Sequence, residues 1–186
     1  MKIEIELITA CINKEQRAEY ELYEKTYSYL MSICLRYVNS REEAREMFNI
    51  GFFKILTNLD KYQLDKSFKS WMARIMVNVL IDEYRKEKKH HQNIQYVEDY
   101  TENEEHADIN YALVKMDVEQ INALIVKLPP VSQKVFNMYV IDGFSHKEIA
   151  ESLGMTDGTS RWHLNFSKKQ LKEMIQKITS PVKMVS

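Results

Sequence analysis

The sequence predicts an all-α protein made of two small helical domains joined by a flexible acidic linker. Its 186 residues include only 4 Gly and 3 Pro, too few for a turn-rich sandwich or barrel. Apolar residues recur at helical spacing over most of the chain. The formal net charge of −1 is unevenly distributed: residues 1–90 carry 16 basic and 14 acidic residues, residues 91–127 carry 2 and 8, and residues 128–186 carry 8 and 5. Two mildly basic blocks therefore flank an acidic middle, and a basic face on each could meet phosphates.

The N-terminal region is expected to form two helices. Residues 3–7 alternate as a strand would, but the sequence offers no partner strand, so a short helix is the better prediction. A longer helix is predicted over residues 14–38, with its inner face formed by Leu22, Thr26, Leu30, Cys34 and Val38. Cys11 and Cys34 form no CxxC pair, which favours core residues in a reducing compartment. With no run of ~20 apolar residues and no signal peptide, we expect a soluble, cytoplasmic protein without membrane insertion.

The next helix, from Ser40 to about residue 57, has the clearest apolar period. Ser40 is predicted to cap it, and Glu43 three residues later would complete a capping box. The predicted buried stripe consists of Ala44, Met47, Phe48, Gly51, Phe52, Ile55 and Leu56. Ile50 and Phe53 fall on the opposite, otherwise polar face. Two interpretations stay open for them, an interaction surface or a wider core contact.

A polar loop and a long helix follow. Residues 58–66, which contain Tyr62, predict an exposed loop. In the helix over residues 67–89, the predicted core stripe is Phe68, Trp71, Met72, Ile75 and Val79. Another face carries side chains that can bond base edges and phosphates, namely Arg74, Asn78, Asp82, Arg85 and Lys89.

Residues 91–108 are polar, acidic and without period, which predicts an extended, solvated linker. The first domain is therefore predicted to span residues 1–90 and the second residues 109–186. In the second domain, a helix is expected to end before Pro129-Pro130 and to bury Leu113, Met116, Ile121, Leu124 and Leu128. Another is expected from Val135 to Gly143.

The strongest local signal is a helix-turn-helix. Ser145 and Glu148 predict a capping box, Gly154 can supply a positive φ at the turn, and Thr156 can cap the second helix. The predicted core of that second helix is Leu164, Leu171, Ile175 and Ile178. Its outer face carries Arg161, Asn165, Lys168, Lys169 and Lys172. Such a helix can enter a major groove, with the arginine reaching bases and the lysines phosphates.

Two longer motifs resemble one known family. Residues 68–78 read Phe-Lys-Ser-Trp-Met-Ala-Arg-Ile-Met-Val-Asn and are followed by Asp82 and Arg85; this resembles region two of the extracytoplasmic-function (ECF) sigma factors of the sigma-70 family. Leu128-Pro129, residues 135–150 and Gly158-Thr159-Ser160-Arg161 resemble region four of the same proteins. The motifs occur in the family's order and, with the preceding helix, span nearly the whole chain.

The resemblance implies a protein that binds core RNA polymerase and directs promoter-specific transcription initiation, with no catalytic residue, cofactor or metal. Region two would contact the polymerase through Glu43, Arg45, Glu46, Asn49, Ile50 and Phe53. It would recognise and melt the minus-ten element through Tyr62, Arg74, Asn78, Asp82, Arg85 and Lys89, with the tyrosine stacking on an unpaired base. Region four would read the minus-thirty-five element through Thr159, Ser160, Arg161, Asn165, Lys168 and Lys169. The family also implies an anti-sigma partner.

Two other functions remain as alternatives at this point. A plain helix-turn-helix regulator would use residues 145–172 alone and bind duplex DNA without a polymerase. It would give no role to the polar helix face that carries Asn78. A metal-dependent helical bundle would use Glu87 and His90, which match Glu-x-x-His. Such a bundle needs two copies of that motif, and the single copy here lies in a basic run.

Overall fold

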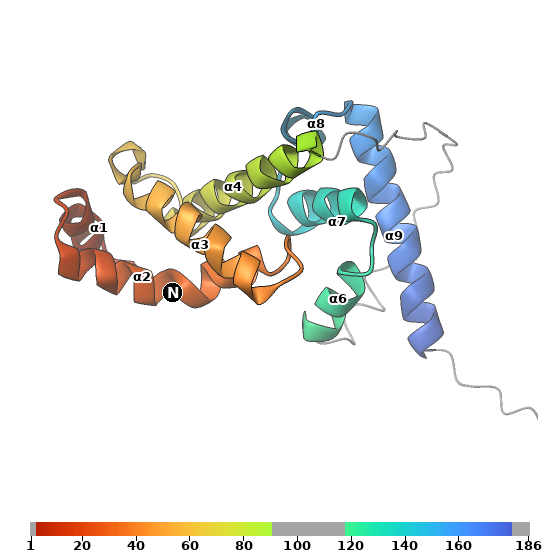
Figure 1. Ribbon diagram of the computed structural model, residues 1–186, viewed down its shortest axis with the longest axis horizontal. Coiled ribbons are helices and arrows are strands. Elements are labelled where there is room, and N and C mark those ends of the chain that lie inside the picture. Colours follow the sequence, from red (N-terminus) through yellow and green to blue (C-terminus); the bar gives the residue numbers. More distant parts are fainter. Residues whose placement is uncertain (1–2, 91–117, 180–186) are drawn as a thin grey trace, which may run out of the picture. The chain divides into compact units, whose positions relative to one another are not determined.

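The computed structural model describes residues 3–90 and 118–179, and these residues form helices with no strand (Figure 1). The all-α prediction is therefore confirmed. The chain divides into two compact units, residues 1–93 (unit 1) and residues 94–186 (unit 2). The predicted linker, residues 91–108, lies outside the described residues, as do Leu113 and Met116. None of the described helices is long and apolar enough to cross a membrane.

The described residues of unit 1 form four α-helices and one turn of 3₁₀ helix. They are α1 (Ile5–Ile12), α2 (Gln16–Cys34), α3 (Arg41–Leu56), η1 (Leu59–Lys61) and α4 (Phe68–His90). Helices α2, α3 and α4 pack on one another, and α1 packs on α2. The start of the chain is thus helical, as predicted. Side chains with almost no exposure fill the centre and include Leu22, Leu30, Phe48, Ile55 and Met72.

Helix α3 begins at the predicted cap residue and packs as its sequence predicts, but only the serine half of the predicted capping box is present. The Ser40 hydroxyl accepts a hydrogen bond from the Glu43 amide at 3.0 Å. The predicted stripe is buried except for Leu56, which is half-buried. At Gly51 an added Cβ would lie 2.5 Å from Sδ of Met76 in α4. The backbone of α3 therefore approaches α4 closely because residue 51 carries no side chain.

Helix α4 buries a wider face than predicted. Phe68, Met72 and Val79 are buried, whereas Trp71 and Ile75 of the predicted stripe are half-buried. The interior also takes up residues that the single stripe omitted, namely Met76, Val77, Leu80 and Ile81. A single stripe was the wrong expectation because α4 is packed against both α2 and α3, and each neighbour covers its own side of the helix.

The two cysteines are free and buried. Burial, with the carboxylates of Glu19 and Glu21 nearby, raises the pKa of the Cys11 thiol to about 11. Burial raises the pKa of Cys34 to about 12. Both thiols stay protonated at neutral pH and are poor nucleophiles, and their location confirms the predicted core role.

Unit 2 contains α6 (Val118–Ile125), α7 (Pro130–Phe136), the π-helical turn η2 (Asn137–Ile141), α8 (His146–Leu153) and α9 (Asp157–Thr179). Helix α9 is the longest and packs against α6, α7 and α8. Its buried apolar residues are Leu164, Leu171 and Ile175, as predicted. Ile178 was predicted to join them, but it is 62% exposed, because none of the described helices covers this last turn.

Helix α7 begins earlier than predicted. The sequence placed the start near Val135, whereas the helix starts at Pro130. Proline suits the first helical position because the missing N–H would have no intrahelical partner there. The turn after η2 uses Gly143 at φ +74°, which matches the predicted end of this segment.

Candidate nucleic-acid interface

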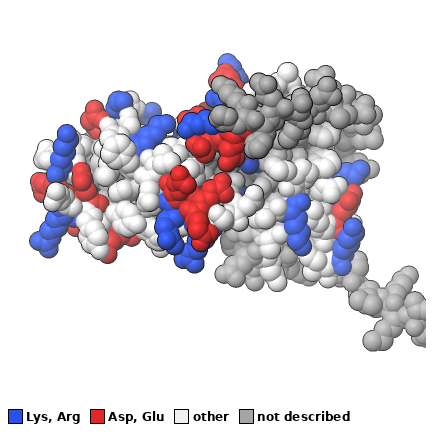
Figure 2. All heavy atoms as spheres, viewed as in Figure 1, with Lys and Arg blue, Asp and Glu red and all other residues white. Residues whose placement is uncertain are grey.

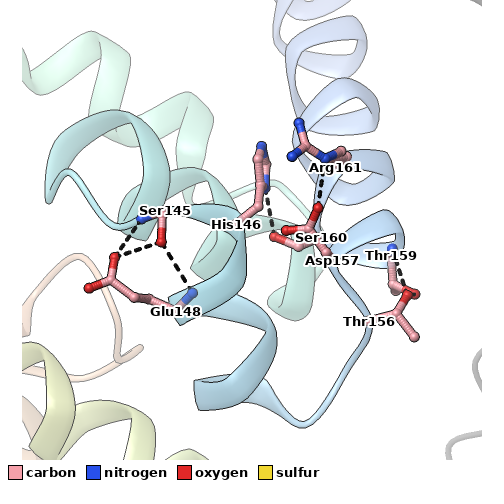
Figure 3. A network of polar contacts seen from close by, with 8 residues as sticks. All are labelled: Ser145, His146, Glu148, Thr156, Asp157, Thr159, Ser160 and Arg161. Atoms are coloured by element: carbon pink, nitrogen blue, oxygen red, sulfur yellow. Dashed lines mark hydrogen bonds and ion pairs between the residues drawn. The ribbon is translucent and has the colours of Figure 1, made fainter.

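The helix-turn-helix of unit 2 has the geometry that its sequence predicts (Figure 3). The Ser145 amide donates to Oε2 of Glu148 at 2.8 Å, and the Glu148 amide donates to Oγ of Ser145 at 3.3 Å. The capping box is therefore complete. Gly154 ends α8 with φ +66°, the left-handed conformation that a side chain would disfavour. These contacts fix the start and end of α8, on which α9 rests.

The N-terminus of α9 is capped by Thr156. Its Oγ1 accepts a hydrogen bond from the Thr159 amide at 3.1 Å and lies 2.8 Å from the Thr159 hydroxyl. Thr159 is half-buried, so its side chain is partly committed to the cap. Asp157 lies in the first turn, where the helix dipole stabilises an acid.

The outer face of α9 carries the predicted polar residues. Arg161, Asn165, Lys168 and Lys169 are all exposed, whereas Lys172, predicted for the same face, is half-buried. Nε of Arg161 donates to Oδ2 of Asp157 at 2.9 Å, one turn earlier on the helix. An ion pair this exposed adds little stability, but it orients the guanidinium. The four remaining N–H donors of Arg161 suit a bidentate contact with a guanine edge.

The inner face of α9 contradicts one predicted contact. Ser160 is fully buried, and its hydroxyl lies 2.9 Å from Nδ1 of His146 in α8. Its side chain therefore cannot serve as a direct DNA contact in this fold. The family resemblance made Ser160 a contact because it belongs to the motif Gly158-Thr159-Ser160-Arg161. Its pairing with a histidine 14 residues away could not be read from that motif.

Buried histidines are the functional candidates that sequence reasoning missed. His146 and His163 are each 8% exposed. Burial lowers the pKa of His146, and the nearby Arg161 charge lowers it further. Burial alone lowers the pKa of His163. The sequence held one signal for them: Ser160, His163 and Ser167 have the helical spacing i, i+3 and i+7, which places three polar residues on one face of the helix.

In unit 1 the polar face of α4 is accessible. Arg74, Asn78, Asp82 and Arg85 are exposed on this helix. Oδ2 of Asp82 lies 3.8 Å from Nζ of Lys54, a cation carried by α3. The Lys89 backbone belongs to α4, but its side chain lies outside the described residues. Figure 2 shows acidic and basic side chains interspersed over the visible face of unit 1.

The loop before α4 holds its tyrosine more firmly than predicted. The Tyr62 ring packs against Phe68 at 4.9 Å and Trp71 at 5.4 Å between ring centroids. Its hydroxyl donates to the Lys66 carbonyl. The neighbouring residues 63–67 are exposed, as expected, whereas Tyr62 is half-buried. Only part of the ring is open to a stacking partner.

The outer face of α3 presents apolar side chains to solvent. Ile50 is 45% exposed and Phe53 is 68% exposed. Arg45, Glu46 and Asn49 are exposed beside them, and Glu43 is half-buried. Within the described part of unit 1 this rules out the wider core contact for the two apolar residues. An interaction surface is the interpretation that remains.

The described residues contain no group of three or more His, Cys, Asp or Glu that could hold a metal ion. Glu87 is exposed on α4, and the side chain of His90 lies outside the described residues. The metal-dependent bundle considered from the sequence therefore gains no support from the described geometry.

Comparisons with known proteins agree across the chain. The family model of sigma-70 region 2 matches residues 22–90, and that of sigma-70 region 4 matches residues 118–171. The ECF RNA polymerase sigma factor SigW of Bacillus subtilis is 24% identical over 161 residues, which cover 79% of this chain and 83% of the relative. The sigma factor SigZ of the same organism is 23% identical over 158 residues, covering 84% and 86%.

Among solved structures, the sigma factor RpoE of Bartonella quintana, crystallised with the anti-sigma factor NepR, has a similar fold. The TM-score is 0.52 at 15% identity, and the match covers 86% of this chain and 97% of that one. The two family models together match more than half of the chain, in the order that the sequence motifs predicted.

Proposed function

This chain belongs to the sigma-70 family, in its ECF group, and directs promoter-specific transcription initiation; from that premise we propose how its residues divide the work. We assign residues 1–90 to region two, residues 91–108 to an acidic linker and residues 109–186 to region four. The proposal is supported chiefly by one observation. Both family matches fall on helical units that present an exposed polar helix face, α4 in unit 1 and α9 in unit 2.

Region two binds core RNA polymerase through the outer face of α3. The apolar side chains of Ile50 and Phe53 supply area that is lost to water on binding. The contact also includes Glu43, Arg45, Glu46 and Asn49. Aromatic residues surrounded by polar ones are typical of the positions that dominate interface energies.

The minus-ten element is recognised and opened by Tyr62 and the polar face of α4. Its contacts are Tyr62, Arg74, Asn78, Asp82, Arg85 and Lys89. An exposed amide such as that of Asn78 can discriminate a base edge by ~1–3 kcal/mol. Since Tyr62 packs on Phe68 and Trp71, a base that stacks on it extends an existing aromatic group.

The minus-thirty-five element is read by α9 in the major groove. Its contacts are Thr159, Arg161, Asn165, Lys168 and Lys169, without Ser160. Arg161 supplies base discrimination, and the lysines supply phosphate contacts whose strength falls with salt.

The protein acts as a specificity subunit in the cytoplasm and catalyses no reaction itself. Its partners are core RNA polymerase, promoter DNA and an anti-sigma factor. The fold is shared with a sigma factor that was crystallised with its anti-sigma factor. We expect such a partner to cover the exposed faces of this chain.

The test is transcription by core RNA polymerase to which the purified chain is added as the sole specificity factor. We expect defined transcript start sites that core polymerase alone does not produce. Phe53→Ala should weaken core binding, with Tyr20→Ala as the matched control, because Tyr20 is similarly exposed, at 63%, on a different helix of the same unit. Tight duplex binding without any core binding would instead favour the plain helix-turn-helix regulator.

A further inference from the structure

The inner face of α9 carries an unusual run of polar residues. Ser160, His163 and Ser167 are 0%, 8% and 0% exposed and lie at positions i, i+3 and i+7. Helix faces at this spacing are ordinarily apolar where they enter a core. These three residues, with His146 of α8 and Ser132 of α7, are called the polar seam below.

Each residue of the seam makes a hydrogen bond to a residue of another helix. Nδ1 of His146 lies 2.9 Å from Oγ of Ser160, and the two side chains face each other between α8 and α9 (Figure 3). Oγ of Ser132 lies 2.8 Å from Nδ1 of His163. Ser167 donates to the Ser132 carbonyl at 3.0 Å and to the His163 carbonyl at 2.8 Å. Helix α9 is therefore hydrogen-bonded to α8 at its start and to α7 further along.

Hydrogen bonds constrain a helix in a way that apolar contacts do not. Apolar burial is non-directional, so a helix held by it alone can rotate slightly at little cost. A buried hydrogen bond tolerates only narrow ranges of distance and angle, and leaving its groups unpaired is costly. Two such bonds to two different helices therefore fix both the rotation and the axial position of α9.

Two side chains on the outer face of α9 directly follow residues of the polar seam in the sequence, so the hydrogen bonds of the seam also fix their positions. Arg161 directly follows Ser160, and Lys168 directly follows Ser167. A rotation of roughly 20° would move a side-chain end ~6 Å from the helix axis by about 2 Å. That displacement exceeds the tolerance of a bidentate contact with a base, whereas a flexible lysine on a phosphate could follow it.

We propose that the polar seam sets the base specificity of region four by fixing the angle at which α9 meets the DNA. His146 and Ser132 are positioning residues, which act through α9 without touching DNA. The inference rests on the proposed reading of the minus-thirty-five element by this helix. It adds that specificity depends on buried groups as well as on the exposed side chains.

The experiment uses holoenzyme reconstituted from the full chain and core RNA polymerase. A promoter library with a randomised upstream element is transcribed by the wild type, and the enriched sequences define the preferred element. Transcription is then measured from the preferred promoter and from versions with one upstream base pair changed. The ratio between them is the readout, because partial unfolding lowers both activities together and leaves the ratio unchanged.

Ser160→Ala and His146→Leu should each lower this ratio roughly tenfold, the size of one lost base discrimination. His146→Asn places an amide where Nδ1 lies and should keep the ratio close to wild type. Ile175→Val is the matched control, since Ile175 is a buried apolar residue of the same helix and should lower output without changing the ratio. Should Ser160→Ala fail to fold, Ser160→Cys is measured in its place.

Unchanged ratios in folded Ser160 and His146 variants would overturn the positioning role and leave the proposed function intact. A wild-type holoenzyme that enriches no upstream element would overturn the reading role of α9 itself. The two failures are therefore distinguished by the wild-type measurement.

Discussion

The interiors of the two units differ in chemistry although both are helical. In the described part of unit 1, Thr26 is the one residue of the polar class that is buried, beside the shielded Nε of Arg36, and it bonds its own helix at the Leu22 carbonyl. In the described part of unit 2 the buried polar residues are Ser132, Gln133, Lys134, Asn137, His146, Ser160, His163 and Ser167. Unit 1 is thus held mainly by non-directional packing, and unit 2 also by directional bonds between helices.

The difference matches what each unit is proposed to contact. In that proposal, the side chains of unit 1 on α3 and α4 meet a protein surface and unpaired bases, where local adjustment of side chains is tolerated. Unit 2 must present one helix to a rigid groove. Buried hydrogen bonds restrict alternative packings in some proteins, and a helix that reads base edges gains most from that restriction.

The chain provides a separate probe for each unit. Trp71 lies in unit 1 and Trp162 in unit 2. A Trp162→Phe background therefore reports unit 1 by fluorescence, and a Trp71→Phe background reports unit 2. Both cysteines lie in unit 1, so the rate of thiol labelling is a second probe of its opening.

The largest expected effect is loss of apolar packing in unit 1. Phe48→Ala should lower the free energy of unfolding of unit 1 by about 3–5 kcal/mol, because Phe48 is fully buried among aromatic rings. Denaturant titration of the Trp71 signal measures it. Phe53→Ala, at an exposed site on the same helix, should change stability by about 0.5 kcal/mol or less. Similar losses for both variants would contradict the assigned core.

A smaller loss of stability is expected when a hydrogen bond of the polar seam is removed from unit 2. Ser160→Ala removes the partner of a buried imidazole and should lower the stability of unit 2 by about 1–3 kcal/mol. The unfolding midpoint followed by Trp162 fluorescence should fall, and the midpoint followed by Trp71 fluorescence should stay unchanged. Combining the variant with His146→Leu should cost less than the two single changes added together, because they remove the same hydrogen bond. Strict additivity would show that the two groups are not coupled.

Lowering the pH should reduce the stability of unit 2 through its buried histidines, by less than the substitutions above. The folded pKa values of His146 and His163 lie below the ordinary value of 6.5. Between each folded pKa and 6.5 the unfolded chain binds more protons, so unit 2 is fully stabilised above pH ~6.5 and loses stability as the pH falls towards the folded pKa values. Unfolding monitored at Trp162 across this range measures the slope. His146→Asn should reduce it, and an equal slope in that variant would exclude His146 as a source.

The smallest stability effect is expected on the surface of unit 2. Asp157→Ala removes an exposed ion pair with Arg161 and an acid from the first helical turn, and should cost only a few tenths of a kcal/mol. The same change should weaken discrimination at the base that Arg161 contacts. Glu21→Ala in unit 1 is the matched control, because it also removes the acid of an exposed ion pair four residues apart, here with Lys25. If Asp157→Ala lowered stability as much as Ser160→Ala, the surface ion pair would matter as much as the buried hydrogen bond, against this prediction.

Local signals made most of the fold predictable. The serine caps of α3 and α8, the left-handed Gly154 and the inner stripe of α3 each depend on residues within a few positions of one another, so the sequence contains them directly. The width of the buried face of α4 was not predictable in this way. Periodicity gives the direction of a buried face, but the number of neighbouring helices decides how much of the circumference is covered.

The site was predictable on its exposed side alone. Arg161, Asn165, Lys168 and Lys169 lie where helical spacing places them. Ser160 was assigned to the DNA contacts by the resemblance of residues 158–161 to region four, which carries no information on burial. Its partner His146 lies 14 residues away, and the pair of Ser132 and His163 is separated by 31 residues. Such pairings form only when the helices pack, so they cannot be predicted from neighbouring residues in the sequence.

The contact between Gly51 and Met76 also bears on oxidative damage. The Met76 thioether is fully buried and its sulfur fills the space that a side chain at position 51 would need. An oxidant reaches this sulfur only when α3 and α4 separate. The resulting sulfoxide is larger and polar, and it would no longer fit between the two backbones. A brief opening under oxidising conditions would then become a lasting loss of unit 1, reversible by a methionine sulfoxide reductase and not by refolding alone.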